Sequence, residues 1–423
     1  MSAGRAAELD RRYVWHPFTP MRDWCAADYE PVVLVGGEGA LLRDSKGREY
    51  VDGNSSIWTN IHGHGHPAIV GAIAEQAGKL AHGSFLGTTN EPAAELAEAL
   101  VGLFPAGTLE RVFYSDDGST AVECAAKMAV QFRQLRGEQG RERFVVFDGA
   151  YHGDTAGAAS LGGIATFHGR FAGFGYDVER LAGVEGLKDV DASAVAAVVL
   201  EPLVQGAAGM RLWPEGMLRE VRAWCDATGV QLILDEVMTG FGRTGSMFAC
   251  GREAVVPDYI ALAKGLTGGT VPLAATLTTA EVFEAFLGAP EEGKTFYYGH
   301  SYCGNAVGCA AALASLRVFE EERVLEKLEG RIAVMGELLA GLAERCGFVR
   351  QVRQCGFIAG VELEAGAAGE LRGARVCEVA RGHGLLTRPV VDTVVLMPPL
   401  CTTEGQLEKA VGAIENAIGE VLG

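Results

Sequence analysis

Lys264 is the residue of this sequence whose type and position point most directly to chemistry. It follows the apolar run 259–263 and precedes Gly265-Leu-Thr-Gly-Gly269, so we expect its amine to emerge at the end of a buried strand with little room for water. The other seven lysines lie in polar turns or on helical patterns, where a solvated amine is expected (46, 79, 127, 188, 294, 327 and 409). Burial lowers the pKa of an amine, which a Schiff-base lysine requires to be nucleophilic near neutral pH. Taken alone, the pattern also fits a lysine that extends its ammonium group to solvent.

Asp235 is a second candidate, because it directly follows the apolar run 230–234. An unpaired carboxylate at the end of a buried strand is costly, so this side chain needs a cationic partner. A protonated pyridine nitrogen is such a partner, and a carboxylate that keeps the ring protonated makes the ring an electron sink for amino transfer. The alternative is that Asp235 caps the N-terminus of a following helix.

A phosphate site is predicted where the run Phe113-Tyr-Ser ends and a helical pattern begins. Gly118 and Ser119 would offer a tight turn, a hydroxyl and the amides of a helix N-terminus, whose dipole favours a dianion. A plain strand–turn–helix junction is the alternative. Asp116 and Asp117 would repel a phosphate, so at least one of them must point away or cap the helix. An amine, a ring partner and a phosphate cradle together fit pyridoxal 5'-phosphate (PLP).

Two further patterns look like ligand sites, and we interpret both as turns. Gly240-Phe-Gly-Arg-Thr-Gly245 fits the dinucleotide-binding expression G-x-G-x-x-G, but it begins five residues after Asp235 and no helical pattern opens behind it. His62-Gly-His-Gly-His66 alternates like a set of metal ligands, yet no carboxylate or thiolate cluster lies nearby. No metal site is therefore predicted.

The elements that must position these residues follow the rhythm of βαβ units. Short apolar runs at 144–147, 195–200, 230–234 and 259–263 end in small or acidic residues and precede helical patterns, which favours a mainly parallel sheet. Ligands of such sheets gather at the carboxyl ends of the strands. Tyr151 lies on the loop after the first of these runs and could border a bound ring.

The two ends of the chain predict a second, smaller α+β unit. The C-terminal part indicates a helix over 324–345, strands over 357–363 and 394–397, and a last helix that opens with a capping box between Thr403 and Gln406. The N-terminal part has a glycine-rich turn at Gly36–Gly39 and a hairpin over 41–51, and is expected to pack with it. We divide the chain into an N-terminal segment 1–60, a large domain 61–315 and a small domain 316–423.

Composition excludes several classes of protein. At 423 residues and 48% hydrophobic content, the chain suits a two-domain enzyme, and its net charge of −18 disfavours nucleic acid as a partner. The N-terminus lacks the apolar core of a secretion signal, and no apolar stretch is long enough to span a membrane, so a cytoplasmic protein is expected. The ten cysteines are scattered singly, which is typical of reduced thiols.

Five segments resemble the class III PLP-dependent aminotransferases, in order and spacing, across nearly the whole chain. They are Asp116-Asp-Gly-Ser-Thr-Ala-Val-Glu123, Tyr151-His-Gly-Asp-Thr155, Glu201-Pro-Leu-Val-Gln-Gly206, Asp235-Glu-Val-Met-Thr-Gly-Phe-Gly-Arg-Thr-Gly245 and Ala263-Lys-Gly-Leu-Thr-Gly-Gly269. The resemblance implies an α/β protein of PLP-dependent transferase fold type I. Such a fold has a large domain built on a mainly parallel seven-stranded sheet, with a smaller α+β domain. It also implies that Lys264 carries the cofactor.

Within that class, other segments are similar to the 7,8-diaminononanoate synthases of biotin biosynthesis. These are Trp15-His-Pro-Phe-Thr-Pro-Met21, residues 53–63, Gly206-Ala-Ala-Gly-Met210, Ala275-Thr-Leu-Thr-Thr279, Arg388-Pro and Leu396-Met-Pro-Pro399. That group converts 8-amino-7-oxononanoate to 7,8-diaminononanoate, usually with S-adenosylmethionine as the amino donor, in a homodimer whose active sites lie at the interface. The resemblance implies that Gly118 and Ser119 hold the phosphate, that Asp235 binds the pyridine nitrogen, and that His300 and Ser301 reach the phosphate of the neighbouring subunit. It places Phe18, Ile57, Trp58, Tyr151, Gly299 and Arg388 around the substrates, with the two-pronged Arg388 suited to a carboxylate.

Four departures from that group bear mainly on the amino donor. Phe18 stands where tyrosine is usual, Ile57 where tryptophan is, Asp117 where serine is, and His300-Ser301 where Pro-Thr is. Phe18 lacks a hydroxyl and Ile57 lacks a flat surface, so S-adenosylmethionine is the expected donor and lysine is the alternative.

Three competing functions share the same fold. They are a class III aminotransferase for an ω-amino acid or diamine, an aminomutase, and a PLP-binding protein without catalysis. The N-terminal Trp15-His-Pro and the Leu396-Met-Pro-Pro segment favour the synthase over the first two. The presence of both Lys264 and Asp235 disfavours the third, because a protein that only binds PLP needs neither a proton-carrying amine nor a protonated ring.

Overall fold

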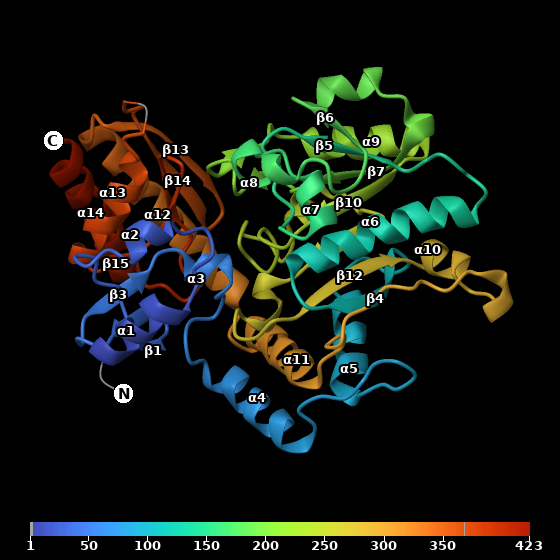
Figure 1. The fold of residues 1–423 in the computed structure, drawn as a ribbon, viewed down its shortest axis with the longest axis horizontal. Helices are drawn as coiled ribbons and strands as arrows, with labels where there is room; N and C mark the ends of the chain where they lie inside the picture. Colours follow the sequence, from blue (N-terminus) through green and yellow to red (C-terminus); the bar gives the residue numbers. More distant parts are fainter. Residues whose placement is uncertain (1–2, 368) are drawn as a thin grey trace.

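The computed structural model describes residues 3–367 and 369–423, and a seven-stranded sheet lies at the centre of its larger part (Figure 1). In spatial order the strands are β4 (Leu109–Ser115), β12 (Ala274–Thr279), β11 (Tyr259–Leu262), β10 (Gln231–Asp235), β7 (Val195–Leu200), β5 (Arg143–Phe147) and β6 (Val178–Leu181). β12 is antiparallel to both of its neighbours, and every other pair in this sheet is parallel. The predicted α/β fold with a mainly parallel seven-stranded sheet is confirmed.

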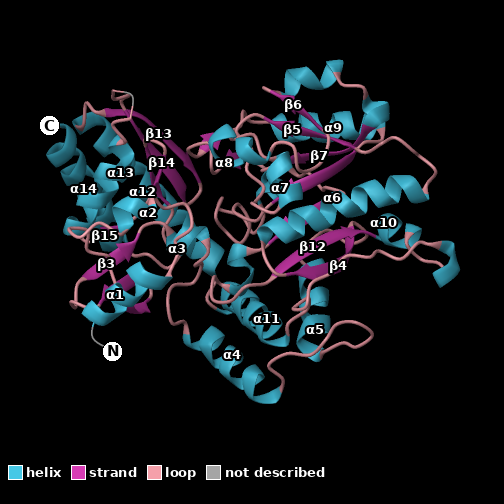
Figure 2. Ribbon diagram, in the orientation of Figure 1, coloured by secondary structure: helices cyan, strands magenta, loops and turns pink. Residues whose placement is uncertain are grey.

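Helices cover both faces of this sheet because its strands are apolar on both sides (Figure 2). Ile233 of β10 packs in the cluster beneath helix α6 (Gly118–Leu135), whereas its neighbours Leu232 and Leu234 point to the opposite cluster. The other helices of this part are α4 (Pro67–Lys79), α5 (Glu91–Val101), α7 (Ala156–Leu161), α8 (Ala165–His168), α9 (Met217–Thr228), α10 (Ala280–Ala285) and α11 (Ala306–Glu321). A short ribbon of β8 (Val204–Gln205) and β9 (Arg211–Leu212) lies after β7.

The C-terminal part forms the predicted α+β unit. Its elements are α12 (Val324–Arg345), β13 (Val349–Cys355), β14 (Ile358–Leu363), α13 (Arg372–Ala380), β15 (Leu385–Leu386), β16 (Pro389–Val390), β17 (Thr393–Leu396) and α14 (Glu404–Leu422). Four of these strands form a sheet in the order β13-β14-β17-β16. The capping box that opens α14 is present as predicted, because the Thr403 side chain accepts the Gln406 N–H and the Gln406 side chain accepts the Thr403 N–H.

The N-terminal segment lies beside this C-terminal unit, as Figure 1 shows in blue and red. Its elements are α1 (Ala3–Tyr13), α2 (Met21–Trp24), β1 (Leu34–Glu38), β2 (Leu41–Asp44), β3 (Glu49–Asp52) and α3 (Ser55–Trp58). The predicted hairpin is formed by β2 and β3, and β3 also pairs in parallel with β15. The domain boundaries at residues 60 and 315 stay a prediction.

One local prediction in this segment is wrong. Gly36 and Gly37 lie inside β1, paired with β2, and the chain reverses only at Gly39 and Ala40. Position 37 needs glycine because the strand passes close to the His64 side chain. A Cβ added at Gly37 would lie 2.8 Å from the Cβ of His64. Glycine here marks a close approach and not a turn.

None of the helices in residues 3–367 and 369–423 combines the length and the apolar character that crossing a membrane requires.

Candidate active site

A cavity of about 450 Å³ opens at the edge of the sheet where β4, β5, β7, β10 and β11 all end. This is the edge that the parallel topology selects, because the carboxyl ends of parallel strands meet there. The structure brings six of the residues predicted for the site into its wall: Trp58, Gly118, Ser119, Tyr151, Asp235 and Lys264. The wall is completed by Thr59, Asp116, Asp117, His152, Gly153, Glu201, Val237, Met238, Ala263 and residues 269–273.

Lys264 begins a short 3-10 turn directly behind β11 and has a positive φ of 39°. Left-handed backbone is uncommon for a residue with a side chain and tends to persist at functional sites. Burial lowers the pKa of its amine, while the carboxylates of Asp235 and Glu201 act in the opposite direction. Its Nζ lies 5.1 Å from the centroid of the Trp58 ring. The amine therefore lies against an aromatic wall of the cavity and has the lowered pKa that the sequence predicted.

Asp235 is the last residue of β10 and is 5% exposed. Its Oδ2 lies 2.8 Å from Nδ1 of His152, and its Oδ1 accepts the N–H of Val237 at 3.0 Å. Residues 236–248 form turns and bends, so the helix that Asp235 would cap under the alternative interpretation does not follow it. The carboxylate is held in a fixed orientation at the cavity wall.

His152 and Glu201 belong to the site, but the sequence patterns had assigned them no role. His152 is 2% exposed, donates from Nδ1 to Asp235, and its Nε2 has no hydrogen-bond partner among the described residues. Glu201 directly follows β7, just as Asp235 ends β10, so the rule about strand ends would have found it. Its oxygens accept the N–H groups of Tyr151 at 3.1 Å and Gly206 at 3.0 Å. Burial raises the pKa of the Glu201 carboxyl to about 7, with His152 acting against the rise and Asp235 adding to it.

The first turn of α6 contains Gly118 and Ser119, the two residues predicted to cradle a phosphate. A Cβ added at Gly118 would lie 2.6 Å from Cγ1 of Val237, so only glycine fits this close approach. Asp117 caps the helix by accepting the Thr120 N–H at 3.0 Å, and this leaves the amides of the first two helical residues for a ligand. The prediction that one of the two aspartates caps the helix is confirmed. Asp116 lines the cavity, with its Oδ2 3.3 Å from Nδ1 of His300.

Tyr151 is linked to this first turn of α6 through Asp154. Its hydroxyl donates to Oδ2 of Asp154 at 2.6 Å, and its ring stacks on His168 with 5.6 Å between centroids and an angle of 16° between planes. The Asp154 N–H donates to Oγ of Ser119 at 3.0 Å. Tyr151 is thereby held as a flat wall beside Ser119. That it borders a bound ring stays a prediction.

The other predicted site residues lie outside this cavity. Ile57 and Arg388 line a second cavity of about 260 Å³, formed with residues of the N-terminal segment such as Trp24 and Tyr29. Phe18 is 56% exposed and packs edge-on against Phe167, with 5.6 Å between ring centroids. Exposed positions are also found for Gly299 and Ser301, and His300 reaches the cavity only through its contact with Asp116.

The side chains of the glycine-rich motif (240–245) and the histidine-rich motif (62–66) bond to other parts of the chain. Arg243 of the glycine-rich motif is fully buried and donates to the carbonyls of Pro398 at 2.6 Å and Asn60 at 2.7 Å. The three histidines share no partner: His62 contacts Ser315, His64 contacts Asp52 and Asn60, and His66 contacts Glu322.

Comparison with known proteins gives one consistent answer. The family model described as aminotransferase class-III matches residues 25–418. A Geobacter sulfurreducens protein named adenosylmethionine-8-amino-7-oxononanoate aminotransferase is 47% identical, with 98% of each chain covered. The crystal structure of the enzyme of that name from Methanocaldococcus jannaschii has a TM-score of 0.96 at 39% identity, with 99% of each chain covered. An (S)-enantioselective omega-transaminase from Thermomicrobium roseum has a TM-score of 0.92 at 29% identity over the full length of both chains. With Lys264, Asp235 and the glycine cradle at one cavity, and with these matches over its whole length, the chain belongs to the class-III aminotransferase family.

Proposed function

We propose that the chain binds PLP in the 450 Å³ cavity and transfers an amino group to 8-amino-7-oxononanoate, forming 7,8-diaminononanoate. The observation that carries the proposal is the convergence of Lys264, Asp235 and the Gly118 cradle on one cavity. Three features of that cavity fit the cofactor: an amine of lowered pKa, a carboxylate with fixed orientation, and a helix start that a Cβ would obstruct.

Bound PLP would supply an electron-withdrawing ring that stabilises negative charge on the carbon that gains or loses the amine. Asp235 would hold a proton at the ring nitrogen, and His152 and the Val237 N–H keep its carboxylate aimed. Lys264 would attach the cofactor and move a proton at Nζ, which its lowered pKa permits near neutral pH. Gly118 and Ser119 would bind the phosphate, and Tyr151 would border the ring.

The relatives support the choice of substrate. Seven proteins named adenosylmethionine-8-amino-7-oxononanoate aminotransferase are 36–47% identical to this chain over almost its full length, and an eighth is 32% identical. The structurally similar omega-transaminases and an amine transaminase from a Pseudomonas species are 26–32% identical. A class III ω-aminotransferase is therefore the second candidate. The proposed place of the reaction is biotin biosynthesis, in the cytoplasm.

A homodimer is part of the proposal. Arg388, Gly299, His300 and Ser301 lie at or near the surface outside the first cavity, where a second copy of the chain would add to the site. We propose that His300 and Ser301 reach the phosphate bound by the neighbouring subunit, and that Arg388 binds the substrate carboxylate.

Replacement of Gly118 by alanine is expected to weaken PLP binding by about tenfold or more, because overpacking at a tight contact typically costs about 1–3 kcal/mol. The new methyl group would collide with Val237, and the helix start would have to shift away from the phosphate. Equilibrium titration of the apoprotein with PLP measures the effect.

Two matched variants make that result specific. Gly118→Ala combined with Val237→Ala restores the space and should recover most of the affinity. Gly71→Ala, in α4 with nothing within 4 Å of its added Cβ, should leave affinity unchanged. Normal affinity in Gly118→Ala would contradict the assignment of this turn to the phosphate.

Incubation of purified protein with 8-amino-7-oxononanoate and S-adenosylmethionine is expected to yield 7,8-diaminononanoate, detected by mass spectrometry. Lysine is the competing donor, because Phe18 and Ile57 offer adenosine fewer contacts than tyrosine and tryptophan would. A missing hydroxyl typically costs about 0.5–1.5 kcal/mol, which shifts affinity by about tenfold and does not abolish use. Product with lysine and none with S-adenosylmethionine would overturn the choice of donor. Product with neither donor would overturn the assignment of 8-amino-7-oxononanoate as the substrate.

Phe18→Tyr is the companion variant. Phe18 packs on Phe167, whose ring centroid lies 6.1 Å from that of Tyr151, so one ring separates position 18 from the Tyr151 wall of the cavity. A gain in rate with S-adenosylmethionine but not with lysine would show that position 18 faces the donor.

A further inference from the structure

The turn that presents Trp58 to the cavity has an unusual backbone. Ser55, Ser56, Ile57 and Trp58 all have positive φ, at 45°, 49°, 69° and 66°. Consecutive left-handed residues are disfavoured for L-amino acids, and most strongly for β-branched ones such as Ile57. Such a turn persists only where surrounding groups hold it in place.

This turn forms the partition between the two cavities. Trp58 and Thr59 line the cavity of Lys264, whereas Ser56 and Ile57 line the second cavity together with Arg388. On the side of Lys264, the Trp58 ring lies over Gly206, where an added Cβ would come within 3.1 Å of the ring. A change in the turn would therefore move a wall of both cavities at once.

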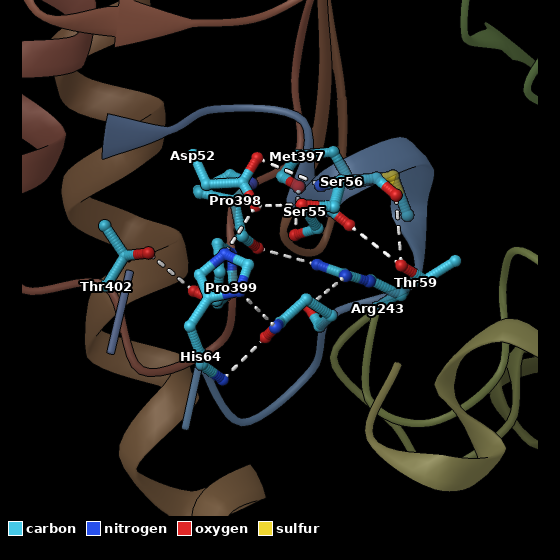
Figure 3. A network of polar contacts seen from close by, with 12 residues as sticks. Asp52, Ser55, Ser56, Thr59, His64, Arg243, Met397, Pro398, Pro399 and Thr402 are labelled. Atoms are coloured by element: carbon cyan, nitrogen blue, oxygen red, sulfur yellow. Dashed lines mark hydrogen bonds and ion pairs between the residues drawn. The ribbon is translucent and has the colours of Figure 1, made fainter. Parts of the chain in front are cut away.

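The carboxylate of Asp52 holds the turn (Figure 3). Its Oδ1 accepts the Ser56 N–H at 2.9 Å, and its Oδ2 accepts the Ser56 O–H at 2.8 Å. His64 Nε2 also donates to Oδ2, at 2.9 Å. Asp52 is 2% exposed, so three donors converge on a buried carboxylate.

The contacts of Asn60 fix the direction of the hydrogen bonds at His64. Asn60 accepts the Gly63 N–H at its Oδ1, so its amide nitrogen is the group that faces Nδ1 of His64, at 3.2 Å. His64 must then accept at Nδ1 and carry its proton on Nε2, which it donates to Asp52. Ser56 and His64 therefore both donate to the Asp52 carboxylate, which can only accept hydrogen bonds.

Further contacts brace both ends of the turn. Ser55 Oγ donates to the Met397 carbonyl at 2.7 Å, and Trp58 Nε1 donates to Oδ1 of Asn54 at 2.6 Å. The buried Arg243 guanidinium bonds the Asn60 carbonyl, and although burial lowers the pKa of that guanidinium, the charge of Asp52 acts to raise it. The partition is thus supported from two distant segments of the chain, around Met397 and Arg243.

We propose that Asp52 is a positioning residue that acts through Ser56 to fix Trp58 at the Lys264 cavity, and that His64 holds Asp52 in the accepting orientation. The activity measurements below rest on the proposed function. The fluorescence measurement does not, so failure of the proposed function can be told apart from failure of the positioning role of Asp52.

A double-mutant cycle tests the path through Trp58. In Asp52→Asn, an amide NH₂ would face Ser56 or His64, which are themselves donors. The change should lower kcat/KM for the amino-acceptor half-reaction by about 10- to 100-fold. In a Trp58→Ala background, the same change should cost less than about threefold, because the side chain it positions is gone. An equal loss in both backgrounds would show that Asp52 does not act through Trp58, and would overturn the proposal.

A second pair of variants covers the case in which Asp52→Asn fails to fold. His64→Gln offers an amide oxygen to Asn60 and an N–H to Asp52, and should keep kcat/KM within about threefold of wild type, whereas His64→Leu should lose about tenfold. His66→Leu is the matched control, since His66 faces Glu322 and not the turn. Equal activities of the two His64 variants would overturn the proposal.

Tryptophan fluorescence reports on the partition without any turnover. The contribution of Trp58 is the difference between each protein and its Trp58→Phe counterpart. Acrylamide should quench that contribution more strongly in His64→Leu than in wild type or His64→Gln, and thermal unfolding recorded in parallel separates this effect from loss of stability. Unchanged quenching in His64→Leu would overturn the proposal, even if the chain showed no aminotransferase activity.

Discussion

Lys264→Ala is expected to lower kcat by about 10⁴-fold or more, because one amine serves as both nucleophile and proton carrier. The structure places this amine behind β11, against the Trp58 ring, with a pKa lowered by burial. Lys264→Arg should be equally inactive, because a guanidinium keeps its proton at any accessible pH. Steady-state rates and single-turnover measurements both report the loss.

The covalent role of Lys264 has its own measurement. Reduction of the PLP-loaded protein with borohydride, followed by digestion and mass mapping, should attach the cofactor to the peptide that contains Lys264. Lys188→Ala, at an exposed lysine, is the control and should retain wild-type turnover. Attachment at any other lysine would contradict the assignment of the site.

Asp235→Asn should retain part of the bound cofactor but lose about 10²-fold or more in kcat, which corresponds to about 3 kcal/mol of transition-state stabilisation. An amide cannot hold the ring nitrogen protonated. It would also turn an NH₂ group toward one of two donors, the His152 Nδ1–H or the Val237 N–H. Absorbance of bound cofactor measures retention, and single-turnover rates measure the chemical step.

Glu201→Gln is the matched comparison, because Glu201 is a second buried carboxylate in the same wall. Burial raises its pKa to about 7, so a large fraction of these side chains is already neutral near neutral pH. As in Asp235→Asn, the amide would turn its NH₂ toward one of two donors, the Tyr151 or Gly206 N–H, so the difference between the two variants reports the loss of charge. The loss in Glu201→Gln should be much smaller than in Asp235→Asn. Similar losses in the two variants would show that neutralising any carboxylate of this wall impairs turnover, and would remove the special role of Asp235.

The sequence predicted best those features that depend on local patterns. The run 195–200 is β7 and the stretch 324–345 is α12, with the bounds expected from their apolar periodicity. Other strands moved by one residue: β10 ends at Asp235 instead of before it, and β14 begins at Ile358 instead of Phe357. Strand ends shift because hydrogen bonding to neighbouring strands, which the sequence does not show, decides where pairing stops.

Residue type and the alternation of strand and helix patterns by themselves predicted that Lys264, Asp235 and Gly118 lie together, because parallel strands bring their carboxyl ends to one edge and polar residues at those ends meet there. Only the tertiary structure decided what surrounds them. His152 meets Asp235 across 83 residues of chain, and Ser55 bonds Met397 across 342, and no local pattern encodes contacts of that range. The left-handed turn from Ser55 to Trp58 runs against the intrinsic preference of its residues, Ile57 above all. The turn keeps this geometry because surrounding groups hold it, among them the buried carboxylate of Asp52, which accepts the Ser56 N–H and O–H and is itself bonded by His64.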